Sequence, residues 1–210
     1  MNPLDLETIE LLSIAATPRP LFILVHDVEG TAADMLQLGH LLGGAFAEAA
    51  VLIPEGLTGS RTGMYEDAGA LDVRVEALAL FVRAQQQRFD VLQSDTALVG
   101  FGAGASLALA FSDAHDGLVG RVLAFGGSHP VWPDKAPLLT TLHLLHGQDD
   151  NVVPVARARE GFERLMALGA DATFDMAASL GHELHPALMD QAITRLQTCV
   201  PLRYWRAAQA

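Results

Sequence analysis

Leu98-Val99-Gly100-Phe101-Gly102-Ala103-Gly104-Ala105 is the stretch of this 210-residue chain that says most about its fold. The first residues read as a buried strand, and the last residues open a helix of small side chains. The alternating glycines let the chain reverse from strand to helix within about one residue, because glycine accepts positive φ and lets two backbones approach closely. The stretch therefore predicts a sharp strand-to-helix turn.

Short apolar segments alternate with helical periodicity on both sides of this turn. The expected strands are Leu21–Val25, Ala50–Ile53, Thr96–Val99, Val122–Phe125, Thr141–Leu145 and Ala172–Met176. The expected helices are Ala32–Leu42, Ala68–Gln87, Ala103–Asp113, Pro154–Leu168 and Leu184–Thr198. This alternation predicts an α/β fold, a mostly parallel sheet with helices on both faces, in a single domain spanning residues 1–210. Ligands of such sheets bind beyond the carboxyl ends of the strands.

Composition excludes several classes of function. Hydrophobic residues make up 50% of the chain, which favours a packed globule, and the formal net charge of −12 argues against nucleic acid and anionic membranes as partners. The one cysteine, Cys199, cannot form an internal disulfide. The first ten residues lack the basic region of a signal peptide, and no apolar stretch is long enough to span a bilayer. We therefore expect a cytoplasmic protein.

The glycine-rich turn admits three interpretations. Gly100-x-Gly102-x-Gly104 matches the G-x-S-x-G nucleophile elbow with glycine in the serine position. Gly100-x-Gly102-x-x-Ala105 also resembles a shortened dinucleotide-binding fingerprint, and a turn without function is the third possibility. A dinucleotide site needs an acid after the next strand, whereas Phe125 is followed by two glycines and a serine. We prefer the elbow to the plain turn, and the plain turn to the dinucleotide site.

An acid and a histidine follow in the chain order nucleophile, acid, base. Asp150 lies beyond the strand that ends at Leu145, and His182 lies in the loop beyond the strand that ends at Met176. An acid at this edge can orient a histidine by accepting its ring N–H. Asp150 also suits the capping of a helix that begins near Pro154. The catalytic interpretation of Asp150 therefore depends on His182.

Together these segments resemble the α/β-hydrolases of the phospholipase/carboxylesterase group, the acyl-protein-thioesterase-like bacterial esterases. The resemblance covers about Leu21 to Cys199, and its motifs are Phe22–Gly30, Leu98–Ala105, His146-Gly147-x-x-Asp150-x-x-Val153 and Leu180-Gly181-His182. It implies hydrolysis of carboxylic esters or thioesters, with neither a cofactor nor a metal. It also implies roles for individual residues: Asp150 as triad acid, His182 as general base, Gly102 at the nucleophile position, and the backbone N–H groups of Val28 and Ala103 as oxyanion hole.

The chain departs from the pattern of this group at one site. Gly102 removes the serine, and the group's His-Gly-x-Gly-Asp loop reads His26-Asp27-Val28-Glu29-Gly30 here. Carboxylates beside a developing oxyanion oppose its charge unless their side chains point away. We therefore expect serine-type esterase activity to be absent or very weak. The alternative is a non-catalytic protein that binds a small ester-like ligand or a protein partner.

Four further expectations concern the surroundings of this site. Ser106, one turn beyond the elbow, should point into packing and not replace the serine. A metal site made from His26, Asp27, Glu29 and His182 is conceivable from residue types, but nothing in their spacing supports it. The loops 58–67 and 128–137, the second with Trp132, should line the cleft. The apolar segment 200–205 should pack either on a second copy, giving a homodimer, or on its own domain.

Overall fold

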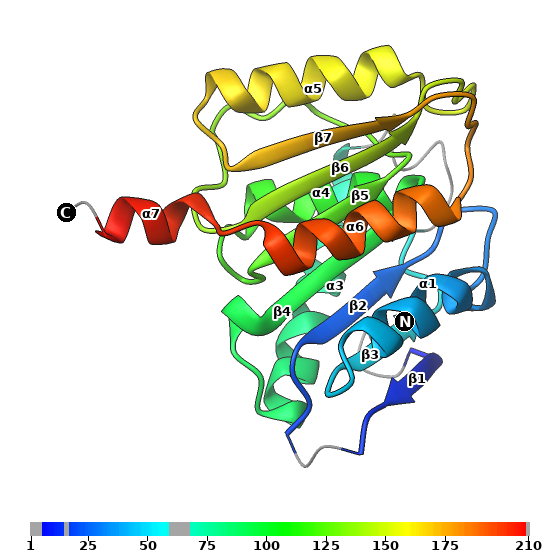
Figure 1. The fold of residues 1–210 in the computed structure, drawn as a ribbon, viewed down its shortest axis with the longest axis vertical. Coiled ribbons are helices and arrows are strands. Elements are labelled where there is room, and N and C mark those ends of the chain that lie inside the picture. Colours follow the sequence, from blue (N-terminus) through cyan, green and yellow to red (C-terminus); the bar gives the residue numbers. More distant parts are fainter. Residues whose placement is uncertain (1–5, 15–16, 59–67, 209–210) are drawn as a thin grey trace.

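The computed structural model describes residues 6–14, 17–58 and 68–208 (Figure 1). Its strands form one seven-stranded sheet in the order β1-β3-β2-β4-β5-β6-β7. β1 pairs antiparallel with β3, and every other neighbouring pair is parallel. The predicted α/β fold is therefore confirmed.

The elements lie close to where the sequence predicts them. The strands are β1 Thr8–Leu12, β2 Leu21–Val25, β3 Ala50–Pro54, β4 Thr96–Phe101, β5 Arg121–Phe125, β6 Thr141–Gly147 and β7 Ala172–Ala177. The α-helices are α1 Leu36–Ala45, α3 Ala68–Phe89, α4 Ala103–Ala114, α5 Val155–Ala167, α6 Pro186–Thr198 and α7 Leu202–Ala208. The described residues also include two short 3-10 helices, η1 Ala32–Met35 and η2 Gln93–Asp95. The prediction missed β1, η2 and α7, and it merged η1 with α1.

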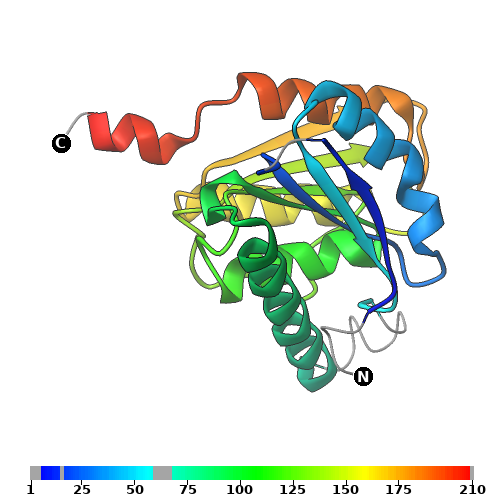
Figure 2. The same cartoon turned by 90° about the horizontal axis from the view of Figure 1, so that it is seen from below.

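Helices cover both faces of the sheet. The α1 and α6 helices lie on one face, and α3, α4 and α5 lie on the other, with the sheet between them in Figure 2. The side chains of β2 alternate between these two layers: Leu21, Ile23 and Val25 join the α3–α5 side, whereas Phe22 and Leu24 join the α1–α6 side. The sheet is therefore buried on both faces, as parallel strands require.

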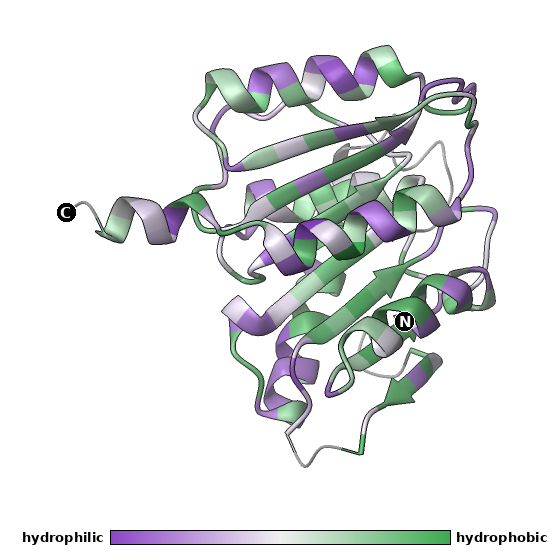
Figure 3. Cartoon of the chain, viewed as in Figure 1, coloured by the Kyte–Doolittle hydropathy of each residue, from purple (hydrophilic) through white to green (hydrophobic). Residues whose placement is uncertain are grey.

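The central strands carry the apolar core. Every residue of β2 and of β3 is buried, and β2 is apolar along its whole length in Figure 3. No helix in the described part of the chain is both long and apolar enough to cross a bilayer.

The C-terminal helix α7 projects from the body of the molecule (Figure 1). Its segment leaves large side chains exposed, with 53% of Tyr204 and 57% of Trp205 accessible. The sequence predicts that this segment packs either on a second copy or on the rest of its own chain. The described part of the chain covers it incompletely. The homodimer remains a prediction.

The strand-to-helix turn depends on small residues that let α4 approach β2. A Cβ at Gly104 would lie 2.2 Å from the carbonyl oxygen of Val25 and 2.6 Å from that of His26. Both atoms belong to backbone that cannot move without shifting the strand. The glycine at 104 therefore sets how closely helix and strand pack.

Replacing Gly104 with alanine should destabilise the fold, while the same change at Gly43 should not. Gly43 lies in α1, and a Cβ there would have no neighbour within 4 Å. Both changes gain helix propensity of about 0.5–1 kcal/mol. At Gly104 we expect the backbone clash to outweigh this gain and to cost about 1–3 kcal/mol. Denaturant unfolding of the two variants tests this, and equal stabilities would contradict it.

Candidate active site

The turn after β4 has the geometry of a nucleophile elbow. Gly102 has φ 57° and ψ −117°, a left-handed conformation that disfavours most side chains. Its N–H donates to the carbonyl oxygen of Phe125 at 2.9 Å, which ties the turn to the neighbouring strand β5. Gly102 is also the N-cap residue of α4, so the amide of Ala103 points out of the first turn of that helix. The elbow is present without a side chain at its tip.

The side chain of Asp27 fills the space in front of this elbow. Its Oδ1 accepts one hydrogen bond from the backbone N–H of Val28 and one from that of Ala103, both at 2.8 Å. These are the two amides that the family resemblance assigned to the oxyanion hole. They do converge on one point, and the oxygen at that point belongs to the protein's own carboxylate. A negative charge at the N-terminus of α4 is also favoured by the helix dipole.

Gly102 and Asp27 depend on each other sterically. A Cβ at position 102 would lie 2.5 Å from Cγ of Asp27 and 2.6 Å from Oδ1. Any side chain at 102, serine included, would therefore collide with the carboxylate in its observed position. Glycine at position 102 therefore provides the space that the Asp27 carboxylate occupies.

Backbone contacts fix the loop that carries Asp27. The ring Nδ1 of His26 donates to the carbonyl oxygen of Asp27 at 2.7 Å, and the N–H of Gly30 donates to the same oxygen at 3.1 Å. The other ring nitrogen of His26 accepts from the N–H of Gly56 at 3.4 Å. His26 is thus a buried support of the loop. With its main chain held at the carbonyl, the Asp27 carboxylate is aimed at the two amides.

Asp150 performs both tasks that the sequence left open, one with each oxygen. Its Oδ1 accepts from the backbone N–H groups of Val152 and Val153 at 2.9 and 2.8 Å, capping the turn before α5. Its Oδ2 accepts from Nδ1 of His182 at 2.8 Å. The Asp150 side chain is fully buried. This bond fixes the His182 tautomer with the proton on Nδ1, so Nε2 faces the elbow as the basic atom.

His182 lies between two carboxylates. Its Nε2 faces Oδ2 of Asp27 at 3.5 Å, which is within ion-pair range and too long for a good hydrogen bond. The ring of Phe101 packs against the imidazole with centroids 4.7 Å apart. Gly126 leaves room on another side, since a Cβ there would lie 3.3 Å from Nδ1. Asp27, His182 and Asp150 are therefore linked in series, with the imidazole in contact with one carboxylate on each side.

Glu29 and Ser106, which were also considered from the sequence, are not among the contacts that link Asp27, His182 and Asp150. Glu29 is exposed. Ser106 is buried and donates to the carbonyl oxygen of Gly102 at 3.2 Å, which confirms that it points into packing. Within the described residues, no three or more His, Cys, Asp or Glu side chains are placed to hold a metal ion.

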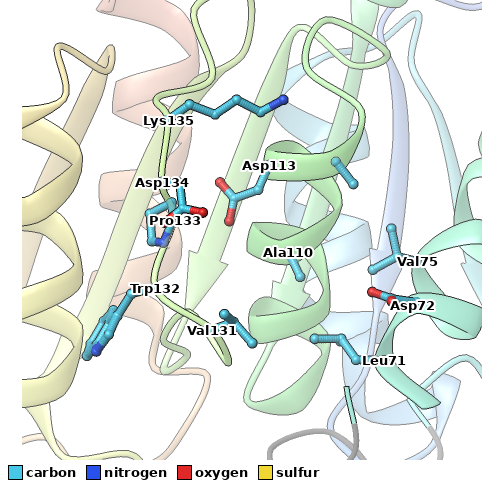
Figure 4. Close-up of a pocket in the computed structure, with 11 residues that line it drawn as sticks. Leu71, Asp72, Val75, Ala110, Asp113, Val131, Trp132, Pro133, Asp134 and Lys135 are labelled. Carbon is cyan, nitrogen blue, oxygen red and sulfur yellow. The ribbon is translucent and has the colours of Figure 1, made fainter. Parts of the chain in front are cut away.

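Trp132 lines a cavity that lies apart from the candidate active site. This cavity, of about 510 Å³, lies between α3, α4 and the segment 131–135, and its lining includes none of Asp27, Gly102, Asp150 and His182 (Figure 4). Most of the other loop expected to line the cleft, residues 59–67, lies outside the described residues.

Asp113 from α4 points toward the segment that carries Pro133 and Asp134 in the same cavity. Burial raises the pKa of Asp113 to about 7, while the charge of Lys135 opposes the shift.

Comparison with known proteins identifies the family. The profile of the phospholipase/carboxylesterase family matches residues 61–200, and the chain is 32% identical over 200 residues to Esterase YpfH of Escherichia coli, covering 90% of this chain and 86% of that protein. The chain belongs to the phospholipase/carboxylesterase family. The resemblance inferred from the sequence motifs is therefore confirmed.

Solved structures agree with the fold of this phospholipase/carboxylesterase family member. Esterase PE8 aligns with a TM-score of 0.83 at 21% identity, covering 93% of this chain and 99% of that one. A phospholipase/carboxylesterase from Dyadobacter fermentans aligns with a TM-score of 0.77 at 19% identity, covering 94% and 99%.

The two flanking carboxylates should control the protonation of His182. Burial alone would lower its pKa, but Asp27 and Asp150 outweigh burial and raise the pKa of His182 above 6.5. The resulting stabilisation is fully present below pH 6.5 and is lost as pH rises through the higher folded-state pKa. Asp27→Asn removes one charge, so the His182 pKa should fall. Titration of the His182 ring by NMR in both proteins measures this, and an unchanged pKa would refute the coupling.

Proposed function

We propose that this member of the family has lost serine-based ester hydrolysis and retains the Asp150–His182 pair as the base of a hydrolytic site. The observation that carries the proposal is the Asp27 carboxylate, whose Oδ1 lies 2.8 Å from both amides that would stabilise an ester's oxyanion. The nucleophile and the oxyanion hole are thus altered together, and the acid–base pair is left intact.

An ester carbonyl has no place at these amides while Asp27 occupies them. Acyl transfer places a developing negative oxygen between such donors, and removing even one donor costs about 10²–10³-fold in rate. Here both donors are engaged by a carboxylate, whose charge would also repel the oxyanion. Water activated by His182 remains available, but it would act without oxyanion stabilisation. We expect ester turnover by the natural protein to be absent or very weak.

Binding without catalysis is the second candidate. The filled amide pair favours it, because the protein's own carboxylate already takes the place of an anionic ligand or product. A small ester-like molecule is the proposed ligand in either case, and the net charge of −12 argues against nucleic acid. Loss of turnover on His182→Ala would support hydrolysis, whereas ligand binding that survives this change without turnover would support the binding role.

Restoring serine chemistry should require two substitutions. We expect no hydrolysis of p-nitrophenyl butyrate above background by the natural protein, and none by Gly102→Ser, because a Cβ at position 102 would lie 2.5 Å from Cγ of Asp27. Asp27→Gly frees the amides but supplies no nucleophile. The double variant Gly102→Ser/Asp27→Gly should gain at least ~10²-fold over either single variant. Initial rates of all four proteins measure this cycle.

His182→Ala in the double variant is the matched control and should abolish the gain. Fluorophosphonate labelling should occur in the double variant alone. Gly102→Ser activity equal to that of the double variant would show that Asp27 does not block the site. Fluorophosphonate labelling of the natural protein would contradict the loss of serine chemistry.

A further inference from the structure

The Asp27 carboxylate has the position that a nucleophile of this site would need. Its Oδ2 lies 3.5 Å from Nε2 of His182, and Nδ1 of the same ring is bound to Asp150. Its Oδ1 is held by two amides, which orients the carboxylate and leaves Oδ2 as the oxygen next to the base. Carboxylates serve as covalent nucleophiles in several classes of hydrolytic enzyme. We propose that Asp27 is the covalent nucleophile of this protein and attacks a saturated carbon that bears a halide leaving group.

The occupied amides favour a saturated carbon over an acyl carbon. Attack on an ester would create an oxyanion on the substrate, and the two donors that would stabilise it are bound to Asp27. Displacement at a saturated carbon creates no such oxyanion, because the negative charge departs with the leaving group. A halide also leaves without a proton, which suits a site whose imidazole acts as a base. Alkyl halides are therefore the substrate class that fits.

In the first step, Oδ2 of Asp27 forms a bond to the carbon while the carbon–halogen bond breaks. The bonding pair leaves with the halide, and the product is an alkyl ester of Asp27. In the second step, Nε2 of His182 takes a proton from water, and the resulting hydroxide attacks Cγ of Asp27. The tetrahedral intermediate expels the alkoxide, which receives the proton back from His182 and leaves as the alcohol. The Asp27 carboxylic acid formed in this step then loses its proton to solvent. The sum is alkyl halide plus water giving alcohol, halide ion and one proton.

The two amides stabilise the second step. When hydroxide adds to Cγ, negative charge develops on Oδ1, which already lies 2.8 Å from the N–H groups of Val28 and Ala103. The oxyanion hole therefore acts on the enzyme's own ester. The family's donors keep their chemical task, and the acyl group they act on is the side chain of Asp27.

Formation of the ester also prepares His182 to act as a base. The charge of Asp27 is one of the influences that raise the pKa of His182. Alkylation turns that carboxylate into a neutral ester, so the pKa falls and the imidazole releases its proton. The site is open to solvent, since 11% of the Asp27 side chain and 10% of the His182 side chain remain accessible.

Trapping the ester tests the proposal. The natural protein, Asp27→Asn and His182→Gln are each incubated with n-butyl bromide. We expect the natural protein to release bromide and butanol, with a rate that falls at least ~10³-fold in Asp27→Asn. His182→Gln should stop after the first step, so its mass should rise by one butyl group, located on Asp27 by peptide mass spectrometry. Asp27→Asn should gain no butyl group at that position.

Heavy-oxygen water provides a second readout that does not depend on variants. In a single turnover of the natural protein, the label should enter the Asp27 carboxylate, and the butanol should be unlabelled. Label in the butanol at the first turnover would overturn the proposal, because water would then attack the carbon directly. Bromide release that persists in Asp27→Asn would also overturn it, as would the absence of both bromide release and alkylation in folded natural protein and His182→Gln.

This inference goes beyond the proposed loss of serine chemistry, and the two fail separately. Rescue of ester hydrolysis in Gly102→Ser/Asp27→Gly would uphold the first even if no alkyl group is ever found on Asp27. Alkylation of Asp27 would uphold the second even if the double variant hydrolyses no ester.

Discussion

Two hydrogen bonds from backbone amides to one carboxylate oxygen organise the functional edge of this protein. One bond comes from Val28, the next residue, and the other joins Asp27, which follows β2, to Ala103, the first residue of α4. Gly102 gives the carboxylate its space, and the carbonyl of Asp27 is itself held by His26 and Gly30. The partners come from two parts of the chain, the loop after β2 and the turn after β4, and the pairing of these two strands brings both parts to the same edge of the sheet.

The same physical property that makes an oxyanion hole makes this arrangement stable. Amides that favour a transient negative oxygen also favour a permanent one, and a hydrogen bond to a charged group contributes about 1.5–3 kcal/mol. A site built for acyl transfer therefore accepts an internal carboxylate readily, provided that the nucleophile's side chain is gone. The 2.8 Å hydrogen bond between Asp150 and His182 does not depend on the position of the Asp27 carboxylate, because Asp150 is held separately by the amides of Val152 and Val153.

The apolar runs of the central strands made the fold predictable, since each is flanked by turn residues and followed by a helix with clear periodicity. β1 escaped prediction because none of its five residues is fully buried and it is held by pairing with β3, far away in the sequence. Asp150 and His182 could be paired from their places after β6 and β7. The direction of the Asp27 side chain could not be predicted from the sequence, because it depends on the rotamer that the side chain adopts. One signal was available: Asp27 stands where the resembled family has glycine, in a chain that also has glycine at position 102.

The most direct test of this account is a crystal structure of the natural protein at neutral pH, with density clear enough to place the Asp27 carboxylate. The account predicts that Oδ1 lies within hydrogen-bonding distance of the N–H groups of both Val28 and Ala103, with Oδ2 facing His182. A water molecule or an anion between the two amides, with the Asp27 carboxylate turned toward solvent, would contradict it.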